Sequence, residues 1–326
     1  MIGSILRAAT VILVAPLITG IIKKCKALLQ GRYGPPIWQP YLDLLKLFGK
    51  QPVMSQHASW LSQIGPMIYA GAIFYAAALV PWSGSNAGLH AGGALLSSGS
   101  GILNSGSAFL GTYNGDLILV ISLFALGRFF IALVGLDAAS AFGGMGSSRE
   151  MLISALAEPA ALLALFTVAI PAGSTNLGSV AHFAMHEGWG DFALPRLLAL
   201  IALVIVILAE TGRIPVDNPD THLELTMVHE GMVLDLSGRH LAWVQWGTSV
   251  KQLLLFVLLT VTFLSGPFEG VAAVAFRLGE VVLIAGAIAL IESTLAKMRL
   301  FKVPGLLGAA FLLALFAMVA QLATGG

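Results

Sequence analysis

The sequence has little charge for its length. Lys, Arg, Asp and Glu make up 10% of the 326 residues and hydrophobic residues make up 57%, whereas a soluble domain carries about 25% charged residues. This shortage excludes an ordinary soluble protein and predicts an integral membrane protein. The net charge of +1, with no basic patch interleaved with aromatic residues, argues against nucleic acid as a partner.

Cysteine is nearly absent, since Cys25 is the only one in the chain. Iron–sulfur clusters are held by several cysteine thiolates, and nickel–iron centres generally have the same requirement. We therefore expect no redox cofactor in this chain. If the protein serves a redox enzyme, partner subunits carry the electrons.

Sequence motifs of catalysis are also missing. We find no Gly-rich phosphate loop, no nucleophile elbow and no Ser/His/Asp order. His222, His229 and His240 are spaced in a way that fits no common zinc motif. We predict neither a catalytic residue nor a metal site in this chain.

Long apolar runs dominate what is present. Eight of them are long enough to cross the roughly 30 Å hydrocarbon core of a bilayer. They recur without a linker or an internal repeat, which predicts a single all-α polytopic membrane domain over residues 1–326 with about eight transmembrane helices. The runs lie near residues 2–22, 61–82, 115–136, 151–171, 193–210, 250–268, 271–293 and 303–323.

The basic residues gather on one side of these spans. Thirteen of the seventeen Lys and Arg residues lie in the loops after the first, third, fifth and seventh spans. Cytoplasmic loops are enriched in such residues. The bias predicts that these loops face inward and that both termini lie on the outer side of the membrane.

Residues 37–50 form a further amphipathic helix, which we expect along the inner membrane surface. Asp43, Lys46 and Lys50 lie away from its apolar face. Such a helix either serves only as an anchor or also shapes a cavity or docking face. The apolar face consists of Ile37, Tyr41, Leu44, Leu45 and Phe48.

Acidic residues concentrate after the fifth span. Six of the sixteen Asp and Glu residues lie in a predicted inner loop over 210–250, and loops on a rigid scaffold are where function is often displayed. This segment is the first candidate for a functional site. Its acids are Glu210, Asp217, Asp220, Glu224, Glu230 and Asp235.

Several charged residues fall inside the spans, where an ionisable group costs roughly 2.5–3.5 kcal/mol on insertion scales. Glu158 is a candidate for a proton or ion path, or else a hydrogen-bonding group at a kink made by Pro159. Arg128 needs a carboxylate partner that the sequence does not name. Arg277 and Glu280 are three residues apart, so we expect them to pair with each other.

Three segments together resemble the quinone-cavity membrane subunit of respiratory complex I, and in particular its relatives in membrane-bound nickel–iron hydrogenases and formate hydrogenlyase. The similarity covers essentially the whole chain. The segments are Arg32-Tyr33-Gly34-Pro35 with Gln39–Leu47; Gly135-Leu136-Asp137 through Ser148-Arg149-Glu150 to Glu158; and Ala209–Asp217 with Glu224-Leu225 and Asp235–Gly238.

The resemblance implies a coupling subunit in a prokaryotic cytoplasmic (inner) membrane that carries no cofactor of its own. Its implied partners are hydrophilic hydrogenase-like large and small subunits, an iron–sulfur subunit and antiporter-like membrane subunits, which hold iron–sulfur clusters and a nickel–iron centre. Glu158, Glu210, Asp217 and Glu224 are the implied proton or sodium path. The implied counter-charges and loop acids are Asp137, Arg149, Arg213, Asp220, His222, Glu230 and Asp235, and the implied docking residues are Arg32, Asp43 and Lys46.

The acidic segment departs from the complex I pattern. Asp220, His222 and Glu224 stand where that pattern has three glutamates, and the stretch to Ser237-Gly238 is three residues longer. These changes favour the hydrogenase branch over a bound quinone, which stays the alternative. A stand-alone secondary transporter is disfavoured because inverted repeats are missing, and a purely structural anchor remains open.

Overall fold

The computed structural model is helical throughout the part of the chain that it describes, which is residues 2–55, 58–81, 115–186, 193–217, 228–264 and 270–324. No β-strand occurs in these ranges, and Asp116 and Asn176 form an isolated bridge. The predicted all-α membrane fold is confirmed.

Seven of the described helices are long and apolar enough to cross a membrane. The predicted span at 193–210 is also a helix, α9, although it is not among those seven. The elements in chain order are α1 (Ile2–Leu29), α2 (Gln39–Phe48), α3 (Trp60–Leu79), α6 (Leu117–Asp137), α7 (Ala141–Ala169), α8 (Leu177–His186), α9 (Ala193–Glu210), α10 (His229–Val233), α11 (Gly238–Phe263), α12 (Gly270–Thr294), the 3₁₀ turn η2 (Leu300–Lys302) and α13 (Val303–Thr324).

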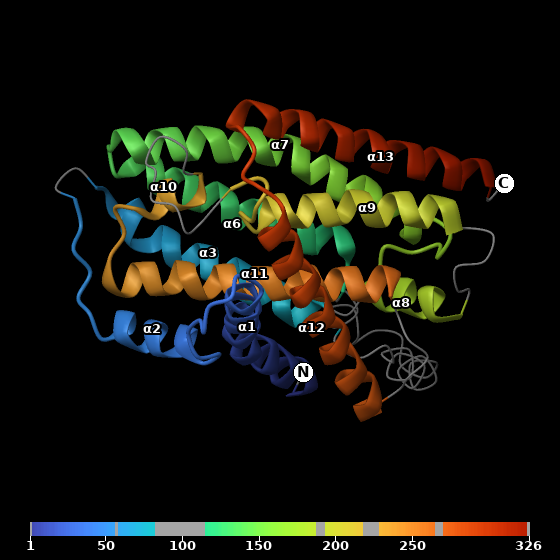
Figure 1. Cartoon of the computed structure of the whole chain (residues 1–326), viewed down its shortest axis with the longest axis horizontal. Helices are drawn as coiled ribbons and strands as arrows, with labels where there is room; N and C mark the ends of the chain where they lie inside the picture. The colour runs from blue at the N-terminus through green and yellow to red at the C-terminus, as the bar shows by residue number, and fades with distance from the viewer. Residues whose placement is uncertain are drawn as a thin grey trace, which may run out of the picture.

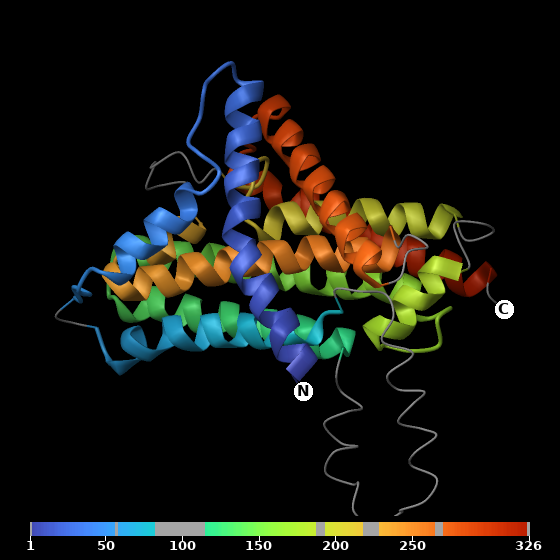
Figure 2. The same ribbon diagram turned by 90° about the horizontal axis from the view of Figure 1, so that it is seen from below.

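Two groups of helices differ in direction. Figure 1 shows α3, α6, α7, α9, α11 and α13 running beside one another along the long axis of the molecule. Helices α1 and α12 cross this group steeply and pack against each other (Figure 2). Helix α11 lies at the centre, in contact with α1, α3, α9 and α12, and nearly all of its outer half is buried.

The starts of three helices are fixed by short polar side chains. The Ser59 hydroxyl accepts a hydrogen bond from the Leu61 amide at 3.2 Å, and the Asp116 carboxylate accepts one from the Ile118 amide at 2.9 Å. Ser140 does the same for the Gly143 amide at 3.1 Å. Each cap satisfies an amide that the helix itself leaves unpaired, so α3, α6 and α7 begin at these residues.

Helix α11 begins at Gly238, well before the expected start of the span at residue 250. The predicted inner loop over 210–250 is therefore too long. The first turns of α11 were missed because they alternate polar and aromatic residues: Trp243 and Trp246 pack on Phe48 of α2 and Phe74 of α3. The predicted amphipathic helix at 37–50 is confirmed as α2.

Candidate functional site

A buried cluster of charges centres on Arg128 of α6, whose side chain is 5% exposed. Its guanidinium lies 2.9 Å from the Glu158 carboxylate of α7 and also bonds Glu210 at the end of α9. Its Nε lies 3.6 Å from the carboxylate of Glu150. A carboxylate partner was expected for Arg128. The structure provides three carboxylates, which come from the two helices α7 and α9.

A second cation completes the cluster. The Lys251 ammonium of α11 lies 2.8 Å from the Glu210 carboxylate, so Glu210 is held between Lys251 and Arg128. With all groups ionised, the cluster has three carboxylates and two cations. Because isolated charge is costly inside a membrane, one added cation such as a proton would bring this cluster to neutrality.

Exposure differs among the three carboxylates. The Glu158 side chain is 32% exposed, compared with 7% for Glu210 and 14% for Glu150. Glu158 and Glu150 each make one ion contact, to Arg128, among the described residues. Glu158 is therefore the most exposed carboxylate of the cluster and, within the described part of the chain, depends on contact with Arg128 alone for an opposite charge.

A cavity of ≈ 490 Å³ lies beside this cluster, between α1, α2, α10, α11 and the turn after α9. It is polar, with Thr211, Arg213, Asp217, His229 and Glu230 on its wall. The predicted docking residues Asp43 and Lys46 of α2 line it too. Helix α2 therefore shapes a cavity, which was one of the two roles left open by the sequence.

Two smaller cavities continue from the large one toward Glu158. One of ≈ 30 Å³ shares Thr211, Gly212, Asp217, His229 and Thr248 with the large cavity, and it also touches Glu150, Glu210 and Lys251. The next, of ≈ 20 Å³, is lined by Arg128, Glu158 and Glu210. Each has room for a water molecule. Because Glu210 lines both small cavities, it lies where they meet.

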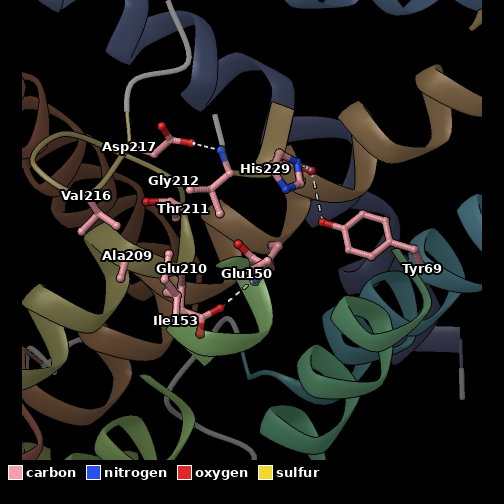
Figure 3. Close-up of a pocket in the computed structure, with 13 residues that line it drawn as sticks. Tyr69, Glu150, Ile153, Ala209, Glu210, Thr211, Gly212, Val216, Asp217 and His229 are labelled. Carbon is pink, nitrogen blue, oxygen red and sulfur yellow. Dashed lines mark hydrogen bonds and ion pairs between the residues drawn. The ribbon is translucent and has the colours of Figure 1, made fainter. Parts of the chain in front are cut away.

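Figure 3 shows the middle cavity, where Glu150 and Glu210 lie on one side and Asp217 and His229 on the other. Tyr69 and Thr248 link their hydroxyls at 3.1 Å, and Thr248 lies 3.5 Å from the His229 ring. Tyr69, Glu150 and Lys251 were not predicted as site residues from the sequence. Lys251, a lysine at the start of a predicted span, was the clearest signal of the three.

A second ion-pair network surrounds Glu292 of α12. Arg213 lies 3.1 Å from its carboxylate and Lys26 of α1 lies 3.5 Å from it. Arg213 also donates to Gln252 at 3.0 Å. The Glu292 side chain is 0% exposed, so both cations contact a fully buried carboxylate. Arg213 is buried and lies on the wall of the large cavity, where its ionic partner is Glu292.

Asp217 is held near the inner cavity by two contacts. The Lys297 ammonium lies 2.9 Å from its carboxylate, and the Val228 amide donates to it at 3.1 Å. This predicted path residue therefore lies on the wall of both the large and the middle cavity. The other three expected residues of the acidic segment, Asp220, His222 and Glu224, lie outside the described residues.

Other predicted site residues lie apart from the cluster. The Asp137 carboxylate accepts from the Ser59 amide at 2.8 Å and from the Ser62 amide and hydroxyl at 3.2 and 2.6 Å, which fixes the start of α3. Asp235 accepts a hydrogen bond from Ser140. Both acids tie inner chain segments together.

The other charged residues singled out from the sequence lie outside the Arg128 cluster. Arg149 lies on α7 with its guanidinium 4.0 Å from the Met145 sulfur, and Arg32 is exposed after α1. Arg277 and Glu280 interact electrostatically, but without an N–O contact within 4.0 Å in the described part of the chain, so the expected pair forms only at longer range. No group of three or more metal-ligating side chains occurs among the described residues.

The fold and this site define a polytopic helical membrane protein in which a polar cavity lies beside a buried acid–base cluster. The NADH dehydrogenase family matches residues 2–323, and the chain belongs to this family. The resemblance found in its motifs is thereby confirmed.

Individual relatives point to the hydrogenase branch. The chain is 32% identical to formate hydrogenlyase subunit 4 of Escherichia coli (strain K12), over 98% of each chain. It is 31% identical to hydrogenase-4 component C of the same organism, over 96% of this chain and 93% of the relative. It is 28% identical to NADH-ubiquinone oxidoreductase chain 1 of Triticum aestivum, over 78% of this chain and 74% of the relative.

The fold recurs in a solved structure, that of the membrane-bound sulfane sulfur reductase, an archaeal respiratory membrane complex. The TM-score is 0.78 at 23% identity, over 98% of this chain and 99% of the other. At this identity the likeness shows the fold alone.

Proposed function

We propose that this chain is the membrane-anchor and ion-coupling subunit of an energy-converting hydrogenase or formate hydrogenlyase-type complex. Its inner face docks a hydrophilic redox arm, and its buried charges join electron transfer in that arm to proton or sodium movement. The similarity to the formate hydrogenlyase and hydrogenase-4 subunits supports the kind of complex.

The observation that carries the coupling role is the series of cavities from the inner face to Glu158. Asp217 and His229 border the large and middle cavities, and Glu210 borders the middle and the deepest ones. Water in these spaces would connect the carboxylates by hydrogen bonds. In this proposal an ion passes from the large cavity to Glu158 by way of Asp217, His229 and Glu210, which line successive cavities.

Coupling follows from electrostatics within this series. A change of charge in the docked arm alters the field at Asp217 and Glu230, which line the large cavity. Glu210 responds next, because it competes with Glu158 and Glu150 for the Arg128 guanidinium. When Arg128 shifts toward Glu210, Glu158 loses its only cation and takes up a proton.

In this proposal the partner subunits hold the redox centres. The partners are hydrogenase-like large and small subunits, an iron–sulfur subunit and antiporter-like membrane subunits. The complex lies in a prokaryotic inner membrane. The exposed Arg32 and the cavity-lining Asp43 and Lys46 provide inner contacts for the arm. Both termini face outward, as the distribution of basic residues indicates.

The test is Glu158→Gln in the assembled complex, reconstituted in vesicles. The amide keeps the shape of the side chain but cannot carry the ion, so proton or sodium uptake per turnover falls at least tenfold while the subunits still co-purify. Glu280→Gln is the matched control, because Glu280 is an intramembrane acid outside the cluster. Equal ion uptake by the two variants would exclude the coupling role.

A quinone-reactive role is the second candidate, and the large inner cavity favours it. Its volume of ≈ 490 Å³ falls within the usual range for small-molecule pockets. The similarity to NADH-ubiquinone oxidoreductase chain 1 also supports a quinone role. Solvent extraction of the purified complex distinguishes the quinone role from the ion-coupling role. Stoichiometric co-purified quinone, together with inhibition by quinone-site ligands, would favour this second role.

A further inference from the structure

The large cavity has a rim of three lysines, none of which belongs to the series of carboxylates that leads to Glu158. Lys23 of α1, Lys46 of α2 and Lys50, which follows the end of α2, all line it. All three are exposed residues, and none has a carboxylate within 4.0 Å of its ammonium among the described residues.

The other charges of the cavity wall are only partly compensated. Lys26 and Arg213 share the single carboxylate of Glu292, and Asp217 is paired with Lys297. The three rim lysines face two carboxylates, Asp43 and Glu230. The cavity and these partners therefore keep an excess of two positive charges, which favours an anion there.

The position of the cavity indicates where the anion comes from. Helix α2 forms one wall and exposes Leu42 (53%) and Leu45 (70%), as an amphipathic helix in the membrane interface does. The Tyr41 hydroxyl donates to the Leu13 carbonyl of α1, and the Leu13 side chain is 61% exposed. Apolar surface thus adjoins the junction of α1 and α2 at the cavity.

We propose that this lysine-lined cavity binds a phosphate group, and that an anionic phospholipid supplies it. The phosphodiester, with its single negative charge, sits among Lys23, Lys46 and Lys50. The glycerol hydroxyls of the headgroup donate to Glu230 and Asp43. The acyl chains remain outside, along Leu13, Leu42 and Leu45, because ≈ 490 Å³ accommodates a headgroup but not two acyl chains.

Bound lipid would fill the space between α1 and α2 and fix the amphipathic helix in the interface. Three lysines near an anionic surface give a binding advantage of roughly 100-fold. The large cavity is also the entrance of the proposed ion path, but Glu158 and Arg128 lie in a different cavity, so lipid binding is measured separately from ion uptake.

The experiment compares two sets of substitutions in the complex purified from its membrane. One set is Lys23→Gln, Lys46→Gln and Lys50→Gln together. The matched control removes three exposed basic residues that do not line the cavity, with Arg239→Gln, Arg299→Gln and Lys302→Gln. Phosphatidylglycerol binding is measured by native mass spectrometry after transfer from phosphatidylcholine nanodiscs with added phosphatidylglycerol.

The cavity set should weaken phosphatidylglycerol binding roughly 100-fold, while the control set changes it by less than about threefold. If both sets of substitutions weakened phosphatidylglycerol binding equally, the proposed site would be wrong, because the lysines would then act only through the net charge of the protein. Inorganic phosphate is the competing probe. If it displaces phosphatidylglycerol at equal concentration, the phosphate site stands and the lipid source is wrong.

Discussion

The Arg213 guanidinium contacts the fully buried Glu292 carboxylate at 3.1 Å, which joins the turn after α9 to the inner end of α12. Arg213 lies three residues after Glu210, which belongs to the Arg128 cluster. The two buried networks are therefore linked through one short turn. The backbone between Glu210 and Arg213 therefore carries one residue of each network.

Glu292→Gln should destabilise the protein. Removing one partner of a buried ion pair costs about 3–5 kcal/mol, and here Lys26 and Arg213 both lose their carboxylate. We expect a clear drop in the thermal unfolding temperature of the detergent-solubilised complex. Glu280→Gln serves as the comparison, and a similar small change in both variants would contradict the assigned role of Glu292.

Arg128→Lys should impair ion coupling although it preserves the charge. A lysine ammonium is a compact point charge and lacks the planar fork with which Arg128 contacts Glu158, Glu210 and Glu150 together. We expect at least tenfold less ion uptake per turnover in reconstituted vesicles. Lys251→Arg is the companion variant and should retain most uptake, since Lys251 has one carboxylate partner among the described residues.

Gly247→Ala should disturb the contact between α3 and α11. A Cβ at Gly247 would lie 2.7 Å from the Tyr69 ring, which then moves away from Thr248. Overpacking of this kind costs about 1–3 kcal/mol. Chemical denaturation in detergent would measure it. Gly71→Ala on α3 is the control, because nothing lies within 4 Å of a Cβ there, and it should be neutral or slightly stabilising.

Asp137→Ala should reduce stability without changing ion coupling. The Asp137 carboxylate accepts the Ser59 and Ser62 amides at the start of α3, and loss of a helix cap costs about 0.5–2 kcal/mol. Unfolding measurements should show this loss, while the ratio of ions moved to turnovers stays at the wild-type value. A lowered ratio would support the role of Asp137 as one of the loop acids and counter-charges of the coupling network.

Several features followed from the sequence because they depend on local pattern. The apolar runs define the membrane helices by length alone. The helical periodicity of apolar residues over 37–50 was sufficient to predict α2. Glu158 and Glu210 were identifiable because placing an acid in or beside an apolar run costs free energy, which makes such an acid a candidate functional residue. Asp137 was identifiable as an acid at the end of an apolar run, but its contacts with Ser59 and Ser62 at the start of α3 were not.

The tertiary structure decided which charges meet. Arg128 contacts Glu158 and Glu210 from 30 and 82 residues away, and Arg213 contacts Glu292 from 79 residues away. Such pairings depend on how helices cross and which faces they turn toward each other. No local pattern encodes that, because packing of the whole bundle sets it. The sequence by itself determined a helical membrane protein with charges in its spans, and only the assembled bundle made those charges a connected network.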